Sequence, residues 1–266
     1  MFARSDLMDL CTDFLKIRMG NIMDKKERID KIIASQGLAT RSEVKAMIKR
    51  GEVVVNGVVI KDSGTKACYS DEIFVDGQKL FQTKYTYIML NKPEGVVSAT
   101  DDKRYKTVVD ILPDDLKRKN LFPAGRLDKD TIGFCLITDD GEFAHDILSP
   151  SKHVTKTYIA RLSKSIDYEQ AKKSFHEGVI LGDGTVLLSA ILEQIEDGGT
   201  PIYKVIVKEG KYHQVKRMFL RFGAEVTELK RIAIGGLPLD DSLKSGEARL
   251  ISADELKSIV ENDERF

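Results

Sequence analysis

The sequence predicts an α+β protein in which a small N-terminal α/β unit precedes a larger unit built on a mixed or antiparallel sheet. Three observations support this class. The chain has 266 residues, which suits two ordinary domains with real cores. Hydrophobic residues make up 42% of it and charged residues 32%, which argues against a disordered chain. Its strand-like segments are separated by stretches too uneven in length for a regular series of βαβ units. We therefore expect an N-terminal extension over residues 1–26, a small domain over 27–80 and a larger domain over 85–259.

The N-terminal extension has two interpretations of equal weight. Leu7, Leu10, Cys11, Phe14 and Leu15 follow a period of 3.6 residues, which is typical of a short amphipathic helix. The alternative is an upstream extension before a second start at Met23. No apolar run approaches the ~18 residues of a membrane span, and acidic residues interrupt any signal peptide. The sequence thus favours a cytoplasmic protein.

Local signals define the small domain. An apolar stripe that stops at Gly37 predicts a first helix. Thr40 and Glu43 have the spacing of a capping box and predict the start of a second helix. Asn56-Gly57 between two β-branched runs predicts a two-residue hairpin turn. A compact module of two helices and several strands is expected.

The larger domain alternates strands with helices. The segments with strand character are, in order, Tyr85–Leu90, Gly133–Thr138, Lys156–Leu162, Ile202–Lys208 and Arg249–Ile251. The clearest helix extends from about Tyr212 to Phe222 and stops at Gly223. The Asp139-Asp140-Gly141 segment indicates a turn that leads into another helix.

The net charge says nothing about a polyanionic partner, because 42 basic residues balance 42 acidic ones. Only local clusters of basic residues can indicate one. The clusters contain Arg41, Lys45, Lys49 and Arg50; Lys152, Lys156 and Arg161; and six Lys or Arg between residues 204 and 221. One such cluster alone is more typical of a solvated face. Three of them favour RNA as the partner.

Asp128 is the strongest candidate for chemistry. It precedes the buried-looking strand GFCLIT, so it is expected in a loop at the edge of the sheet. A carboxylate there, beside a cation, stays ionised and can act as nucleophile or base. A magnesium site formed by Asp128, Asp130, Asp139 and Asp140 is a weaker alternative. Three separate cysteines without metal-ligand spacing disfavour zinc and a disulfide framework.

Four motifs resemble those of the pseudouridine synthases that modify ribosomal RNA. They are NKPEG (91–95), GRLDKDTIG (125–133), KTY (156–158) and EGKYHQVKRMF (209–219). Residues 28–77 resemble the alpha-L-type RNA-binding domain named after a small-subunit ribosomal protein. The YHQVKRMF segment is most similar to members that act on 16S rRNA. The resemblance spans residues 28–259.

The resemblance implies roles for individual residues. Asp128 corresponds to the catalytic aspartate and Tyr158 to the tyrosine that stacks on the flipped-out base. Lys216 corresponds to the basic partner of the aspartate, with Arg217 as the alternative one position on. Arg126 corresponds to the residue that helps displace the target nucleotide. The expected RNA contacts are Arg126, Arg41, Lys45, Lys49, Arg50, Lys156, Arg217 and Arg221.

Isomerisation of uridine needs neither a redox group nor a donated group, so no cofactor and no metal are expected. The sequence also lacks a glycine-rich dinucleotide loop and a P-loop. The expected partner is ribosomal RNA, 16S first, with the protein acting as a monomer away from membranes. The rival hypotheses are a synthase that acts on 23S rRNA and a non-catalytic rRNA-binding assembly factor, which would not need Asp128.

Overall fold

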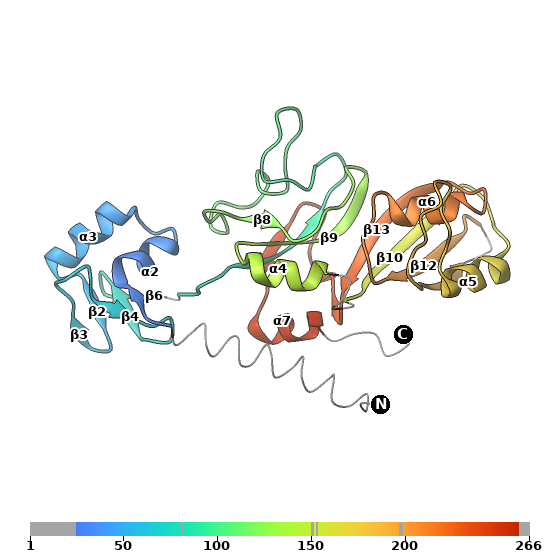
Figure 1. Cartoon of the computed structure of the whole chain (residues 1–266). Coiled ribbons are helices and arrows are strands. Elements are labelled where there is room, and N and C mark those ends of the chain that lie inside the picture. The colour runs from blue at the N-terminus through green and yellow to red at the C-terminus, as the bar shows by residue number, and fades with distance from the viewer. Residues whose placement is uncertain (1–24, 81, 150–151, 153, 197–198, 261–266) are drawn as a thin grey trace, which may run out of the picture. The chain divides into compact units, whose positions relative to one another are not determined.

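The computed structural model describes residues 25–80, 82–149, 152, 154–196 and 199–260 (Figure 1). These residues form two compact units. The first extends to Thr86 and includes Lys117–Leu121, and the second comprises Tyr87–Leu116 and the residues from Phe122 onward. The helix expected near Leu7 lies outside the described residues. No helix among the described residues is long and apolar enough to span a membrane.

The first unit contains two helices and two small sheets. Its elements are, in order, β1 (Glu27–Arg28), α2 (Ile29–Ser35), α3 (Arg41–Arg50), β2 (Val53–Val55), β3 (Val58–Val59), β4 (Lys66–Ala67), β5 (Ile73–Val75) and β6 (Gln78–Leu80). The larger sheet has the antiparallel order β3-β2-β5-β6, and β1 pairs with β4. The core comes from the apolar faces of α2 and α3 and from alternate residues of β2 and β5.

The local signals of the first unit are confirmed. The Thr40 hydroxyl accepts a hydrogen bond from the Glu43 amide at 3.3 Å, and the Glu43 carboxylate accepts one from the Thr40 amide at 2.7 Å. This reciprocal pair is the capping box that starts α3. Asn56 and Gly57 both have positive φ, 48° and 79°, and join β2 to β3. Two left-handed residues in a two-residue turn match the right-handed twist of the strands.

A buried carboxylate joins the two helices. Asp30 on α2 is fully buried and accepts hydrogen bonds from Arg28 at 3.0 Å and from Arg41, the first residue of α3, at 3.1 Å. Burial alone raises the pKa of Asp30, but the hydrogen bonds from Arg28 and Arg41 outweigh it and lower this pKa to about 2. Arg41 therefore has a structural partner within the unit.

The second unit is built on one large mixed sheet. Its elements are, in order, β7 (Tyr87–Lys92), β8 (Phe122–Pro123), β9 (Thr131–Thr138), α4 (Gly141–Leu148), β10 (Lys156–Leu162), α5 (Tyr168–Glu177), β11 (Ile191–Glu196), β12 (Ile202–Val207), α6 (Gln214–Leu220), β13 (Val226–Ile234), β14 (Leu237–Pro238), β15 (Ala248–Leu250) and α7 (Ala253–Val260). The order is β11-β12-β10-β13-β9-β7-β15, with β14 on β13 and β8 on β9. Among the described strands of this sheet, β13 and β9 pair in parallel and the other neighbours pair antiparallel, so the predicted mixed sheet is confirmed.

Helices α5 and α6 lie together beside β10 and β12 (Figure 1). Phe175 of α5 and Phe219 of α6 bring their ring centroids to 5.4 Å, and Tyr203 of β12 approaches Phe219 at 5.7 Å. Helix α6 begins at Gln214 rather than at the expected Tyr212, because His213 before it has a left-handed backbone with φ 48°. This core fixes α6, and the helix and the residue before it each supply a side chain to the site.

Candidate active site

Asp128 lies in the loop between β8 and β9, as the sequence predicts. The Leu127 amide donates a hydrogen bond to the Ser98 hydroxyl at 3.1 Å, and the Thr131 amide donates one to the Asp128 carbonyl at 3.1 Å. These bonds hold the backbone on both sides of Asp128. Its side chain is 28% exposed, which leaves the carboxylate open to a substrate.

A buried lysine supports this loop from beneath. Lys92, at the end of β7, donates from Nζ to the carbonyls of Pro93 at 3.1 Å, Lys129 at 3.2 Å and Thr131 at 2.8 Å. Burial lowers the pKa of Lys92 to about 8, against the attraction of nearby acidic groups that include Asp128. The lysine of the NKPEG segment thus positions the Asp128 loop.

Helix α6 and the residue that precedes it bring two nitrogen-bearing side chains to Asp128. Lys216 Nζ lies 3.4 Å from Asp128 Oδ2, and His213 Nε2 lies 3.4 Å from Asp128 Oδ1. Lys216 also donates to Asp130 Oδ1 at 2.5 Å. This hydrogen bond from Lys216 lowers the pKa of Asp130 and outweighs the effect of burial, so the ammonium bridges two carboxylates.

His213 is the residue that sequence reasoning missed at this site. Because the expected helix puts His213 on the same face as Arg217 and Arg221, the sequence predicts that His213 contacts backbone or an RNA phosphate. The structure instead directs its ring toward Asp128, because the left-handed backbone at His213 turns the chain into α6. Unlike Asn56, His213 belongs to no turn motif whose residues require a positive φ, so its left-handed backbone could not be predicted from the sequence.

A small pocket opens in front of Asp128. The sequence-predicted residues Arg126, Asp128 and Tyr158 all line it. Its other lining residues are Leu127, Thr131, Val207, Glu209, Gly210, Lys211, His213, Gln214, Val215 and Leu229. Tyr158 is held in the middle of the sheet, where β10 pairs it with Val205 of β12 and Arg231 of β13. The pocket thus combines a carboxylate, an aromatic ring and an arginine.

Lys156 does not suit the RNA contact predicted for it. Only 6% of the residue is exposed, and its Nζ donates to the carbonyls of Ile147 at 3.0 Å and Val154 at 2.7 Å. Ile147 lies in the last turn of α4, whose final carbonyls lack partners within the helix. Lys156 therefore closes the end of α4, and its prediction as a phosphate-binding residue is corrected.

The buried ammonium of Lys156 makes stability depend on pH. Burial lowers its pKa from 10.5 to about 8, with a further lowering by Arg231. Between these two values the unfolded chain binds more protons than the folded one, so this group's contribution to stability rises with pH. Wild type should gain about 3 kcal/mol relative to Lys156→Met as the pH rises from about 8 to about 10.5. Urea unfolding of both proteins across this range measures the gain.

The matched control is Lys45→Met, which removes an exposed lysine. Its stability difference from wild type should stay level over the same range. A difference between wild type and Lys156→Met that does not change with pH would contradict the buried ammonium.

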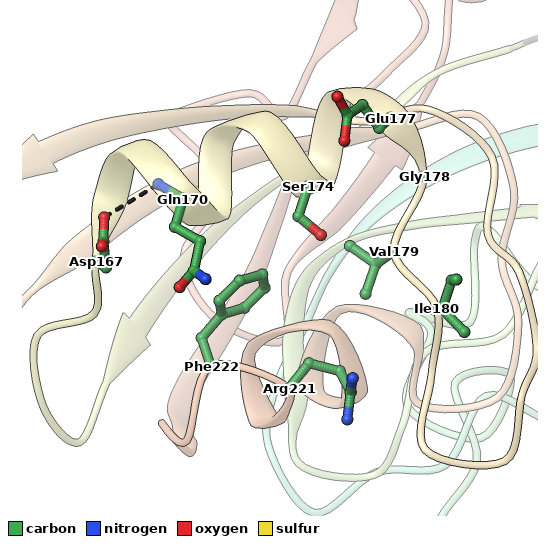
Figure 2. A pocket seen from close by; sticks show the side chains of 9 residues that line it. All are labelled: Asp167, Gln170, Ser174, Glu177, Gly178, Val179, Ile180, Arg221 and Phe222. Carbon is green, nitrogen blue, oxygen red and sulfur yellow. Dashed lines mark hydrogen bonds between the residues drawn. The ribbon is translucent and has the colours of Figure 1, made fainter.

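The other two basic residues predicted to contact RNA in the larger unit, Arg217 and Arg221, do not line the Asp128 pocket. Arg217 forms an ion pair with Asp183 at 2.5 Å, so Lys216 rather than Arg217 faces Asp128. Arg221 lines a larger cavity of about 620 Å³ between α5 and the turn that follows α6 (Figure 2). That cavity shares no lining residue with the Asp128 pocket. The cavity is lined by two carboxylates, those of Asp167 and Glu177, and by one guanidinium, so its charge does not favour a phosphate group.

The four basic residues of α3 divide into two pairs. Arg41 contacts the buried Asp30, and Arg50 contacts Glu52 at 2.5 Å. Lys45 and Lys49 are exposed on α3, and among the described residues neither has an ion-pair partner. Among the basic residues of α3, these two lysines are therefore the ones open to an RNA phosphate.

The predicted turn at Asp139-Asp140-Gly141 is confirmed, and it leads into α4. Asp140 thus has a structural role that does not involve Asp128. Asp140 is buried, caps α4 by accepting from the Phe143 amide at 3.0 Å, and accepts from the Tyr87 hydroxyl at 2.6 Å. Among the described residues no group of three or more His, Cys, Asp or Glu side chains is arranged to hold a metal ion.

Comparison with known proteins gives consistent matches. The family model for RNA pseudouridylate synthase matches residues 86–221, and the S4 domain model matches residues 27–73. An uncharacterized RNA pseudouridine synthase of Bacillus subtilis (strain 168) is 43% identical over 88% of this chain and 98% of its own. The ribosomal small subunit pseudouridine synthase A of Escherichia coli (strain K12) is 39% identical over 88% of this chain and 100% of its own. A crystal structure of a pseudouridylate synthase, 37% identical, covers 87% of this chain and 99% of its own with a TM-score of 0.61.

The chain belongs to the RNA pseudouridine synthase family and carries an S4 domain ahead of the synthase domain. It is accordingly an isomerase that acts on RNA. This finding argues against the rival hypothesis of a non-catalytic assembly factor.

Proposed function

We propose that this enzyme converts one uridine of 16S rRNA into pseudouridine, with Asp128 as its catalytic carboxylate. The observation that carries the catalytic role is the position of Asp128 in the pocket, with Lys216 Nζ at 3.4 Å from its carboxylate. The choice of 16S rRNA is supported by similarity to three relatives named ribosomal small subunit pseudouridine synthase A, 37–40% identical to this chain.

The reaction moves one bond and needs no external group. The bond from uracil N1 to ribose C1′ breaks and a bond from C5 to C1′ forms, while C5 loses a proton and N1 gains one. An ionised Asp128 can attack C1′, or it can act as the base that leads to a glycal-like intermediate. Both routes require a carboxylate at this position, and Lys216 places a positive charge 3.4 Å from it.

Tyr158 and Arg126 handle the target nucleotide. A uridine must leave its stack before Asp128 can reach its sugar, and unstacking costs a few kcal/mol. In this proposal the Tyr158 ring stacks on the extruded base and takes part in the final proton transfer, and Arg126 helps displace the nucleotide. Both side chains line the pocket that contains Asp128.

Mapping of pseudouridine in 16S and 23S rRNA from cells with and without the gene tests the choice of substrate. Loss of a single pseudouridine from 16S rRNA is the expected result. If 16S rRNA keeps all its sites and 23S rRNA loses one, the substrate proposal is wrong.

A 23S target is the second candidate, because one observation favours it. The ribosomal large subunit pseudouridine synthase B of Bacillus subtilis (strain 168) is 37% identical to this chain over 88% of it and 95% of its own length. The same mapping experiment separates the two candidates.

We further propose that the first unit docks the enzyme on RNA through α3. Replacing Lys45 and Lys49 together with Gln should weaken RNA binding and lower the salt dependence of the affinity by about 1.5 log units per log unit of salt. Turnover of bound RNA should not change, because neither lysine belongs to the Asp128 pocket. Binding titrations at several salt concentrations, with single-turnover rates alongside, measure both effects.

Arg41 is left in place because it supports the buried Asp30. The matched control is Lys79→Gln, since Lys79 is already paired with Glu72 at 2.7 Å. An unchanged salt dependence in the double variant would count against docking through α3.

A further inference from the structure

Tyr212 is an exposed aromatic side chain at the edge of the active site. It is 76% exposed, more than any other large apolar side chain in the described part of the chain. Its two sequence neighbours, Lys211 and His213, both line the pocket of Asp128. Because the Tyr212 ring stacks on the ring of His213, it lies at the rim of this pocket.

The ring belongs to a stack that extends outward from Asp128. His213 Nε2 lies 3.4 Å from the Asp128 carboxylate, and the Tyr212 ring stacks on the His213 ring with centroids 3.9 Å apart and planes 16° apart. One face of the Tyr212 ring is covered by His213. Among the described residues no other aromatic ring stacks on Tyr212, and the high exposure of the residue places its outer face in solvent.

The backbone around Tyr212 is held without help from its own side chain. The Lys211 amide donates to Gln214 Oε1 at 2.9 Å, and Lys211 Nζ donates to the Val186 carbonyl at 3.1 Å. Glu209 accepts from the Leu188 amide at 2.8 Å. The loop is therefore preorganised, and burial of the Tyr212 ring is not what holds it in place. Preorganised groups lose little entropy on binding, which favours them as contact points.

We propose that the outer face of Tyr212 is a stacking platform for the base next to the target uridine in the RNA strand. The proposal rests on the proposed function and adds a second nucleotide subsite to it. When the uridine leaves its stack, the adjoining base loses a stacking neighbour, and an aromatic side chain can replace it. Any base can stack on such a ring, so Tyr212 contributes affinity rather than sequence choice.

A double-mutant cycle tests the platform. Its protein arm is Tyr212→Ala, and its RNA arm is a fragment containing the mapped target uridine with an abasic residue on its 5′ or 3′ side. Tyr212→Ala should weaken binding of the intact fragment about 5- to 100-fold, and Tyr212→Phe should bind nearly as wild type does. An abasic residue on one side should weaken wild-type binding similarly and have no further effect on Tyr212→Ala.

The control variant is Leu220→Ala, which removes another exposed apolar side chain of the same unit and should bind as wild type does. At each neighbouring position the affinity falls by one factor for Tyr212→Ala and by another for the abasic residue. If these two factors multiply at both positions, Tyr212 acts only by holding His213, and the proposed platform is wrong. Product formation in the same reactions separates this failure from that of the proposed function. If wild type forms no pseudouridine in 16S or 23S rRNA fragments, the proposed function fails and the platform fails with it.

Discussion

Asp128→Asn should abolish pseudouridine formation, with a loss of about 10⁴-fold or more in the single-turnover rate. The amide has the size of the carboxylate but can neither attack the ribose nor accept a proton. The fold should persist, because the side-chain contacts of Asp128 are with two partly exposed residues, His213 before α6 and Lys216 on it, and not with a core. RNA affinity should therefore change little, so the loss should fall on the chemical step.

Asp130→Asn is the matched control for this result. Asp130 lies two residues away, contacts the same Lys216, and its side chain is 63% exposed. An exposed ion pair contributes up to about 1 kcal/mol, so the rate should fall less than about fivefold. Equal losses in the two variants would contradict a distinct role for Asp128.

Lys216→Met should lower the single-turnover rate about 10²- to 10³-fold, which is the usual effect of removing one preorganised electrostatic contact. Lys216 is the cation that faces both Asp128 and Asp130, so its loss leaves two carboxylates without this compensation. The pKa of Asp130 should rise, because the hydrogen bond from Lys216 is what lowers it. Measuring the single-turnover rate against pH, together with the affinity for RNA, separates the loss of the Lys216 charge from weaker RNA binding.

Two variants test whether charge and position both matter at Lys216. Lys216→Arg keeps the positive charge and should retain most of the activity. Arg217→Met removes the neighbouring cation, which contacts Asp183 instead of Asp128, and should have a small effect. If Arg217→Met is the more damaging change, the assignment of the basic partner to Lys216 is wrong.

Features set by a few neighbouring residues could be predicted from the sequence. The Asn56-Gly57 turn needs two residues that tolerate positive φ, and the capping box of Thr40 and Glu43 satisfies amides within one turn of helix. Both depend on local chemistry that the sequence states directly. The mixed sheet followed from the uneven spacing of its strand-like segments.

Features set by distant parts of the chain could not be predicted. Nothing in the sequence places β9 beside β13 in parallel, with Thr131 opposite Leu229. The charge of Lys156 predicts a surface position. Its ammonium instead lies in the interior, where a carbonyl at the end of α4 accepts a hydrogen bond from it. The approach of His213 to Asp128 depends on a backbone conformation that only the folded surroundings select.

The most direct measurement is pseudouridine mapping of 16S rRNA from cells that lack the gene and carry it back in one of three forms. The wild-type and Asp130→Asn forms should each restore the missing pseudouridine, and Asp128→Asn should leave a uridine there, with all three proteins present at equal levels. Restoration by Asp128→Asn would contradict the catalytic role of this carboxylate.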